Sequence, residues 1–328
     1  MKCTNRRMKY QIFAMAAAAA ILITGCGSTE YDMAYKLNSD VSSFQLAGVA
    51  EQETLTPFAA DLCVVGENNV SASGVSLSKA EAAALFNLKT LDTIYAKNVN
   101  EQLHPASLTK VMTALVAIKY GSTDQILTAS ENVKVTEPGA VLCGINPGDQ
   151  MTLDQALHVL LLLSANDVAI LIAEGVAGSV EEFVRLMNEE ADAIGATNCN
   201  FTNPNGLTEE GHYMTVYDLY LIFQEALQYD LFNQIIQMPA YTSTYKDRNG
   251  NDKSLDIKTS NRYLRGNYEM PSNVTIIGGK TGTTTAAGSC LVLLSRSSDG
   301  TPYISIIMKD SSGDQLYADM TELLGIIK

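Results

Sequence analysis

Histidine is scarce in this chain of 328 residues, and its spacing is unfavourable for binding a metal. His104, His158 and His212 are the only three, and successive ones lie 54 positions apart. Zinc sites favour close spacings such as H-x-H or H-x-x-x-H. A zinc peptidase is therefore not supported, no metal or cofactor is expected, and each histidine is interpreted as an isolated helix or loop residue.

Cysteine pairs of the C-x-x-C type are also missing. Beyond the N-terminal segment the chain has Cys63, Cys143, Cys199 and Cys290, all far apart in sequence. This spacing indicates neither a zinc site nor a thioredoxin-like redox pair. Four cysteines allow three disulfide pairings, and the sequence does not choose among them. Each is equally well interpreted as a small buried hydrophobic residue.

Basic residues are few, which argues against nucleic acid as a partner. The chain has 22 Lys and Arg against 36 Asp and Glu. Four of the basic residues and none of the acidic ones lie in residues 1–25, so without that segment 18 basic residues face 36 acidic ones, a net charge of −18. Nucleic-acid binding needs a basic surface. An anionic substrate would have to meet a local cation in a globally acidic protein.

The N-terminus has the pattern of an export signal: a basic start, an apolar run and then small residues. The run is shorter than the roughly 20 residues that a membrane span needs. The stretch "ILITGCGS" resembles the lipobox of bacterial lipoproteins, which implies cleavage before Cys26, lipidation of its sulfur and anchoring at the extracytoplasmic face of the membrane. An ordinary secretory signal is the alternative. We expect a signal at 1–25, a lipidated cysteine and tether at 26–57, and a globular domain at 58–328.

Hydrophobic patterning in the globular part predicts an α+β fold. Short strand candidates occur from 58 to 97, a buried helix from 105 to 121, two apolar helical stretches that meet at residues 164–166, and an amphipathic helix near 180–196. The last hundred residues predict a hairpin around Asn249-Gly250, successive antiparallel strands and a closing helix. We therefore expect an antiparallel β-sheet flanked by helices, with an inserted all-helical subdomain.

Ser-x-x-Lys occurs three times, and the surroundings differ. Hydrolysis through a serine ester needs a base beside the hydroxyl. A lysine can be that base only when neutral, so its pKa must fall from about 10.4 towards 7, at a cost of roughly 5 kcal/mol. Ser107 and Lys110 lie one turn apart on an apolar helix, where burial lowers a lysine pKa. The other two pairs are placed less favourably. Ser76 and Lys79 lie among small polar residues, and Ser243 and Lys246 lie on a predicted strand, where positions i and i+3 point to opposite faces.

Two further short motifs lie in contexts that suit this chemistry. Ser164 and Asn166 lie where two apolar helices meet, and buried polar groups there need a reason. A hydroxyl can relay a proton and an amide can hold a lysine or a substrate; the alternative is that Asn166-Asp167 caps the second helix. Lys280-Thr281-Gly282 occurs once. Lys280 would supply the local cation, Thr281 a donor to a carboxylate, and Gly282 room for a substrate backbone.

The three motifs in this order are those of penicillin-binding proteins and class A β-lactamases. The blocks "PASLTKVMTA", "LLLLSANDVA", "FVRLMNEEADAIGATNCNFTNPNGL" and "GGKTGTTTAAGSCLV" resemble the serine-type D-alanyl-D-alanine carboxypeptidases, the low-molecular-mass penicillin-binding proteins. The resemblance runs from about Phe58 to the C-terminus. It implies the penicillin-binding protein/β-lactamase-like transpeptidase fold for a D,D-peptidase domain at 58–328. Because 46 residues follow Gly282, we expect no additional C-terminal domain.

The resemblance also implies a role for each motif residue. Ser107 is the expected nucleophile and Lys110 its base, and Ser164 and Asn166 are expected to relay a proton and bind substrate. Substrate binding is expected to involve Lys280, Thr281, Gly282 and Thr283, with the backbone N–H groups of Ser107 and Thr283 as the oxyanion hole. The implied partners are peptidoglycan stem peptides that end in D-Ala-D-Ala, β-lactams as covalent inhibitors, and the membrane through the lipid on Cys26.

Two alternatives remain open at the level of sequence. A class A-like β-lactamase would carry Glu-x-x-x-Asn between the second and third motifs. Here Glu209 and Glu210 are followed four residues later by Tyr213 and Met214 instead. A wall protein that binds or senses penicillin without turnover would keep the same motifs, and only a turnover measurement separates it from an enzyme.

Overall fold

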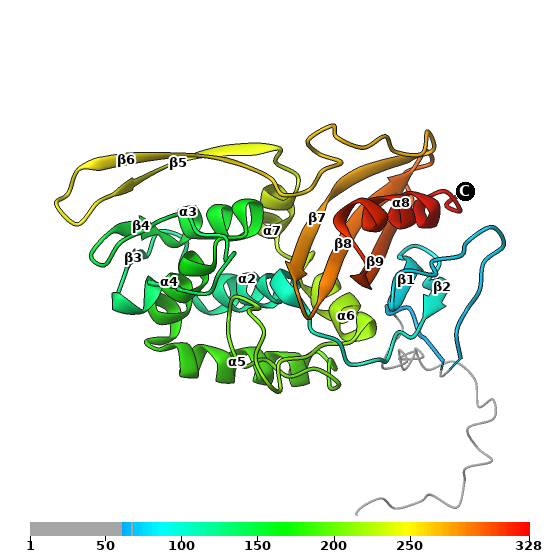
Figure 1. Ribbon diagram of the computed structural model, residues 1–328, viewed down its shortest axis with the longest axis horizontal. Coiled ribbons are helices and arrows are strands. Elements are labelled where there is room, and N and C mark those ends of the chain that lie inside the picture. Colours follow the sequence, from blue (N-terminus) through cyan, green and yellow to red (C-terminus); the bar gives the residue numbers. More distant parts are fainter. Residues whose placement is uncertain (1–60, 67) are drawn as a thin grey trace, which may run out of the picture. The chain divides into compact units, whose positions relative to one another are not determined.

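Two antiparallel sheets organise the described part of the chain, residues 61–66 and 68–328, in this computed structural model (Figure 1). The described residues belong to one compact unit, Phe58–Lys328. The predicted signal, Cys26 and the tether lie outside the described residues. Within residues 61–66 and 68–328, no helix combines the length and the apolar character that crossing a membrane requires.

The larger sheet has five strands in the order β2-β1-β9-β8-β7. Their bounds are β1 Ala82–Asn87, β2 Asp92–Lys97, β7 Val274–Thr284, β8 Gly288–Ser297 and β9 Pro302–Asp310. The central strands are buried on both faces. In β8, Leu291 and Leu293 pack on the side of the C-terminal helix α8 (Gly313–Leu324), whereas Val292 and Leu294 pack on the opposite side, in the core that also contains the central helices. The alternation of a strand thus supplies both cores.

The helical elements other than α8 lie beyond the β7 edge of this sheet and on the face opposite α8 (Figure 1). They are the 3₁₀ turns η2 Ala106–Leu108 and η3 Glu131–Val133, the helices α2 Thr109–Tyr120, α3 Leu153–His158, α4 Asn166–Ala177, α5 Val180–Ala193, α6 Val216–Ala226 and α7 Asp230–Ile236, and the π-turn η4 Val159–Leu163. Residues 109–117 of α2 are all buried, which makes α2 the predicted central helix. The α+β prediction is confirmed.

The middle of the chain is not all helical, so that part of the expectation is wrong. A second sheet runs in the order β3-β4-β5-β6, with β3 Ile126–Thr128, β4 Gln150–Thr152, β5 Ala240–Lys246 and β6 Asp252–Lys258. Strands of three residues, such as β3 and β4, are too short to show a period in the sequence. The predicted hairpin is present, with Gly250 at φ +82° in its turn, but it extends this second sheet.

No strand forms at residues 61–66, although a strand was expected over 58–65. Tyrosine hydroxyls take the place of a neighbouring strand there. The N–H of Cys63 donates to the Tyr220 hydroxyl at 2.9 Å, and the Tyr217 hydroxyl donates to the Cys63 carbonyl at 3.0 Å. The backbone is satisfied by side chains, so burial of this segment does not require a ladder.

Candidate active site

Ser107 lies in the 3₁₀ turn η2, which leads directly into the buried helix α2. The residue before it, Ala106, has φ +48°, in the left-handed region that residues with a Cβ rarely adopt. Such a conformation costs of order 1–3 kcal/mol and persists only where the surroundings impose it. The turn brings the Ser107 hydroxyl to the Lys110 amine, whose Nζ lies 2.9 Å from Oγ.

Lys110 is fully buried and has three oxygen neighbours. Its Nζ lies 2.9 Å from Ser107 Oγ, 2.8 Å from Asn166 Oδ1 and 2.5 Å from the Asn205 carbonyl. Burial lowers the pKa of Lys110 well below its usual range, and the charge of Lys280 lowers it further, while Asp167 acts in the opposite direction. The environment therefore favours the neutral amine.

The partners of Lys110 also fix where the lone pair of a neutral amine points. Asn166 Oδ1 and the Asn205 carbonyl can only accept, so they take the two N–H hydrogens. The Asn166 amide is oriented by its own Nδ2, which donates to the Val141 carbonyl at 3.1 Å. The remaining position of the nitrogen faces Ser107, the one partner with a hydrogen to give. The arrangement is that of a nucleophile beside its base.

Ser164 stands where the π-turn η4 ends and α4 begins, with φ +70°. Its hydroxyl accepts a hydrogen bond of 2.9 Å from Lys280 Nζ. Asn166 and Asp167 are also the first two residues of α4, and Asp167 Oδ1 accepts the backbone N–H of Val168 at 3.0 Å, so the pair contributes to the start of the helix as well. Ser164 and Asn166 face the two lysines that the sequence singled out.

Lys280 and Thr281 come from β7, at the edge of the large sheet. Lys280 is buried, and burial lowers its pKa to about 7. Besides Ser164, its Nζ contacts the Thr281 carbonyl at 2.8 Å. The Thr281 hydroxyl donates to Ser260 Oγ at 2.6 Å. Ser260 was not predicted, since it follows β6 with no motif around it.

Gly282 packs closely against the turn that carries Ser107. A Cβ at this position would lie 3.0 Å from the N of Ser107 and 3.1 Å from the N of Leu108. The missing side chain thus makes room for the turn η2 that carries the serine. Glycine here allows β7 and η2 to pack backbone to backbone.

Asp167, which the sequence suggested only as part of a helix cap, is a further polar residue of the site. Its carboxylate accepts the backbone N–H of Cys143 at 3.1 Å and of Gly144 at 2.8 Å. These bonds hold the loop between η3 and β4 against the start of α4. Asp167 follows Asn166 directly, and its position beside the second motif was the only available signal.

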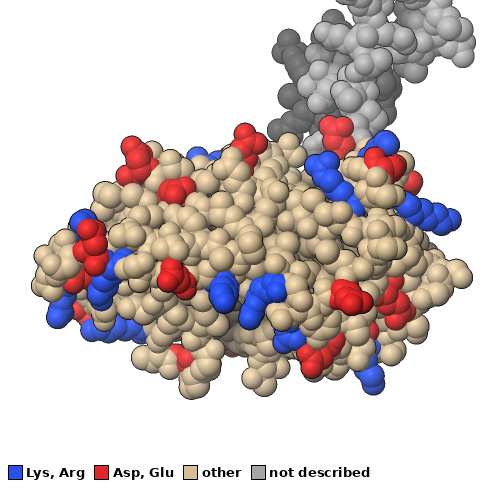
Figure 2. Space-filling model, turned by 90° about the horizontal axis from the view of Figure 1, so that it is seen from above, with Lys and Arg blue, Asp and Glu red and all other residues tan. Residues whose placement is uncertain are grey.

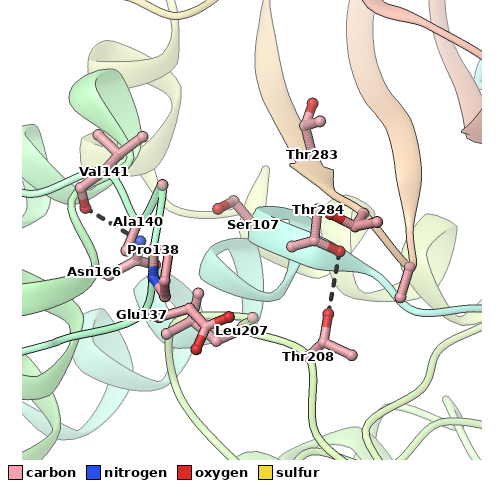
Figure 3. Close-up of a pocket in the computed structure, with 14 residues that line it drawn as sticks. Ser107, Glu137, Pro138, Ala140, Val141, Asn166, Leu207, Thr208, Thr283 and Thr284 are labelled. Atoms are coloured by element: carbon pink, nitrogen blue, oxygen red, sulfur yellow. Dashed lines mark hydrogen bonds between the residues drawn. The ribbon is translucent and has the colours of Figure 1, made fainter.

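A cavity of about 540 Å³ opens in front of Ser107 (Figure 3). Its lining comprises Ser107, Glu137, Pro138, Gly139, Ala140, Val141, Asn166, Gly206, Leu207, Thr208, Thr283, Thr284, Thr285 and Ala286. The close-up shows Ser107 between Asn166 on one side and the threonines of β7 on the other, and Thr208 Oγ1 donates to Thr284 Oγ1 at 3.2 Å.

Figure 2 shows basic and acidic side chains interspersed over one face of the molecule, without a broad basic patch.

The other two Ser-x-x-Lys pairs lie apart from this cavity. Ser76 and Lys79 are exposed. Ser243 is buried in β5, whereas Lys246 of the same strand is exposed and forms an ion pair of 2.6 Å with Asp252. The cysteines that the structure describes, Cys63, Cys143, Cys199 and Cys290, are all free thiols.

Comparisons with known proteins agree with this geometry. The profile of the D-alanyl-D-alanine carboxypeptidases of peptidase family S11 matches residues 68–312. The D-alanyl-D-alanine carboxypeptidase DacF of Bacillus subtilis is 33% identical over 252 residues, 75% of this chain and 61% of that protein. DacC of Escherichia coli is 31% identical over 256 residues, 75% and 60% of the two chains. The chain thus spans about three fifths of the length of these relatives.

Solved structures show the same architecture. The crystal structure of a Streptomyces DD-transpeptidase is 26% identical, with a TM-score of 0.70, and the match covers 78% of this chain and 98% of the other. A D-alanyl-D-alanine carboxypeptidase from Mycobacterium tuberculosis is 27% identical, with a TM-score of 0.66 and coverage of 77% and 93%. The predicted penicillin-binding protein fold is confirmed by this likeness.

Proposed function

The chain belongs to the D-alanyl-D-alanine carboxypeptidase family, and we propose that it removes the terminal D-Ala from peptides ending in D-Ala-D-Ala through an acyl-enzyme on Ser107. The observation that carries the proposal is the set of three oxygens around Lys110 Nζ, of which only Ser107 Oγ can donate. A serine with an unactivated hydroxyl would not need a buried lysine beside it.

In the first step Ser107 Oγ attacks the carbonyl carbon of the penultimate D-Ala, and its proton passes to the neutral Lys110 amine. The carbonyl oxygen becomes the oxyanion, which we assign to the backbone N–H groups of Ser107 and Thr283. Donors aimed at that charge are typically worth 10²–10³ in rate each. The close packing of Gly282 on the N of Ser107 supports this assignment, since it brings the two donor segments together.

In the second step the C–N bond breaks and the nitrogen of the terminal D-Ala takes up the proton that Lys110 accepted, so that Lys110 is neutral again. Ser164 is the proposed relay, because its hydroxyl lies within 2.9 Å of Lys280 Nζ. Lys280 and Thr281 are the groups we assign to the terminal carboxylate, and Asn166 the one that holds Lys110 and the substrate backbone. Water then attacks the ester carbonyl and gives a proton to the neutral Lys110 amine, which passes it to Ser107 Oγ as the ester bond breaks and the shortened peptide leaves.

The setting of this reaction follows from the same family membership. The proposed substrates are stem peptides of peptidoglycan, outside the cytoplasm, and β-lactams are proposed to acylate the same serine. We also propose that residues 1–25 are a signal, that 26–57 link a lipid on Cys26 to the domain at 58–328, and that this lipid holds the protein at the membrane.

The test is release of D-alanine from diacetyl-Lys-D-Ala-D-Ala by residues 58–328, with an intact-mass record after benzylpenicillin. We expect D-alanine release and a long-lived penicilloyl adduct on Ser107. Ser107→Ala should abolish both, and the matched variant Ser76→Ala, in an exposed Ser-x-x-Lys pair, should retain both.

The two alternatives give different records. A β-lactamase would lose the adduct rapidly and accumulate hydrolysed penicillin. A sensing or binding protein would keep the adduct and release no D-alanine. Either result would overturn the carboxypeptidase proposal while leaving the acylation of Ser107 in place.

A further inference from the structure

A buried histidine, His212, is joined to the turn that carries Ser107 by a chain of hydrogen bonds. From the sequence alone, His212 is interpreted as an isolated residue. Its side chain is almost fully buried, and Nε2 lies 2.9 Å from Thr109 Oγ1. The Thr109 hydroxyl in turn donates to the Ala106 carbonyl at 2.9 Å. Ala106 is the residue with φ +48° that immediately precedes Ser107.

The hydrogen-bond partners determine which ring nitrogen carries the proton. Nδ1 accepts the backbone N–H of Thr202 at 3.0 Å, so it has no hydrogen. The proton is therefore on Nε2 and is donated to Thr109. Because the Thr109 hydroxyl has one hydrogen, accepting from His212 directs that hydrogen to Ala106.

The ring is also kept uncharged. Burial lowers the pKa of His212 to about 4, although the charge of Glu209 acts in the opposite direction; His104 also acts to lower it. A neutral ring with Nε2–H can serve as donor to Thr109 at every pH at which the site would act.

Two segments hold the histidine at this position. Leu103 and Met214 exchange backbone hydrogen bonds of 3.0 and 2.9 Å, and His104 Nδ1 lies 3.0 Å from the His212 carbonyl. Segment 212–214 is thus paired with the residues that lead into η2. Gly206 packs directly against the Ala106 carbonyl, where a Cβ would not fit.

We propose that His212 is a positioning residue, which through Thr109 locks the Ala106 carbonyl and so holds the left-handed turn that presents the hydroxyl and N–H of Ser107. The inference rests on the proposed function, in which Ser107 is the nucleophile. His212 takes no part in proton transfer to substrate, because Nε2 is hydrogen-bonded to Thr109 and Nδ1 to the backbone N–H of Thr202. Its contribution is to the geometry of the serine, where misplacement by about 1 Å can cost about 10² in rate.

The test compares the rates at which isosteric variants are acylated by benzylpenicillin. Each rate is divided by the fraction of molecules that is acylated at saturation, so that unfolded protein does not count. Thr109→Val keeps the shape and removes the hydroxyl, and we expect it to lower the second-order rate constant about tenfold or more. Thr109→Ser restores the hydroxyl and should recover most of the loss. His212→Phe should resemble Thr109→Val, and His212→Gln, whose amide can reach the position of Nε2, should lie between it and the unchanged protein.

Controls separate positioning from stability. The double variant Thr109→Val/His212→Phe should be no slower than the slower single variant, since both remove the same chain of hydrogen bonds. His158→Gln, at a buried histidine that stacks on Tyr241 in another part of the fold, should acylate at the unchanged rate. Variants that only lose melting temperature while each acylatable molecule reacts at the original rate would overturn the inference.

A second readout does not depend on enzyme activity. In long-range ¹H–¹⁵N spectra of the histidine side chains, His212 should carry its proton on Nε2 throughout pH 5–8. A proton on Nδ1, or a charged ring in that range, would contradict the inference. Failure of the unchanged protein to react with benzylpenicillin would overturn the proposed function and, with it, the role assigned to His212, even where the spectrum keeps the Nε2–H tautomer.

Discussion

The Ser-x-x-Lys pattern occurs both at the start of α2 and in β5, but only at the start of α2 do the serine and lysine side chains contact each other. In η2 and α2, Ser107 and Lys110 lie one turn apart, Lys110 is buried beneath the cavity that Ser107 lines, and Nζ reaches Oγ at 2.9 Å. In β5, Ser243 is buried while Lys246 is exposed and paired with Asp252. Spacing alone therefore has no chemical meaning: the helix makes the two side chains neighbours, and burial makes the lysine a base.

The largest effect should come from removing the lysine in each region. Lys110→Ala should lower the rate of acylation by benzylpenicillin about 10²- to 10⁴-fold, the usual contribution of a positioned base. Lys246→Ala, which removes only an exposed ion pair, should change it less than about twofold. Stopped-flow or mass-spectrometric acylation kinetics measure both. Comparable losses in the two variants would remove the distinction between the regions.

A smaller effect on the acylation rate should follow from displacing Ser107 and Lys110 by a substitution at a neighbouring residue. Gly282→Ala inserts a Cβ about 3.0 Å from the N of Ser107, a tight contact that the turn can relieve only by shifting. We expect the acylation rate to fall about ten- to a hundredfold, because the turn must shift.

The matched control for this change is Gly66→Ala, where no atom lies within 4 Å of the new Cβ and the rate should stay unchanged. Acylation of Gly282→Ala at the original rate would mean that η2 is less tightly fixed against β7 than its packing indicates.

The smallest effect on acylation should come from removing the negative charge of Asp167, next to Asn166. Asp167 opposes the lowering of the Lys110 pKa and holds the loop at Cys143 and Gly144. Asp167→Asn removes the charge, so the pKa of Lys110 should fall further and the pH profile of acylation should move to lower pH. Weaker bonds to the loop should reduce apparent affinity for benzylpenicillin by several-fold, since a hydrogen bond to a charged group is worth about 1.5–3 kcal/mol. A profile that moves to higher pH would contradict the assigned electrostatics.

The sequence was sufficient to predict the α+β class and to select the three motifs that the fold brings together. Ser107 and Ser164 could be singled out because the apolar context of their segments is local, and Lys280 because its motif occurs only once in the sequence. The apolar run of α2 could be recognised without knowing what packs on it, and so could the junction of η4 and α4.

What the sequence could not supply depends on contacts between distant segments. The carbonyl of Asn205 contacts Lys110 through backbone, so its residue type carries no signal. Gly282 packs on η2 only because the fold brings β7 against that turn. Ser260 belongs to the site only through its hydrogen bond with Thr281. The short strands β3 and β4 have no period to detect, and their membership of one sheet with β5 and β6 depends on pairing between distant segments.

The most direct test of the account is the pH dependence of acylation by benzylpenicillin between pH 5 and 10, with the adduct mapped by peptide mass spectrometry. A protonated lysine cannot accept the Ser107 proton, so the rate should rise with pH as Lys110 loses its proton. Burial lowers that pKa, and the rise should therefore end well below the usual range of a lysine, with the adduct on Ser107. A rate that keeps climbing in proportion to hydroxide up to pH 10, or an adduct on Ser76 or Ser243, would contradict the pairing of Ser107 with Lys110.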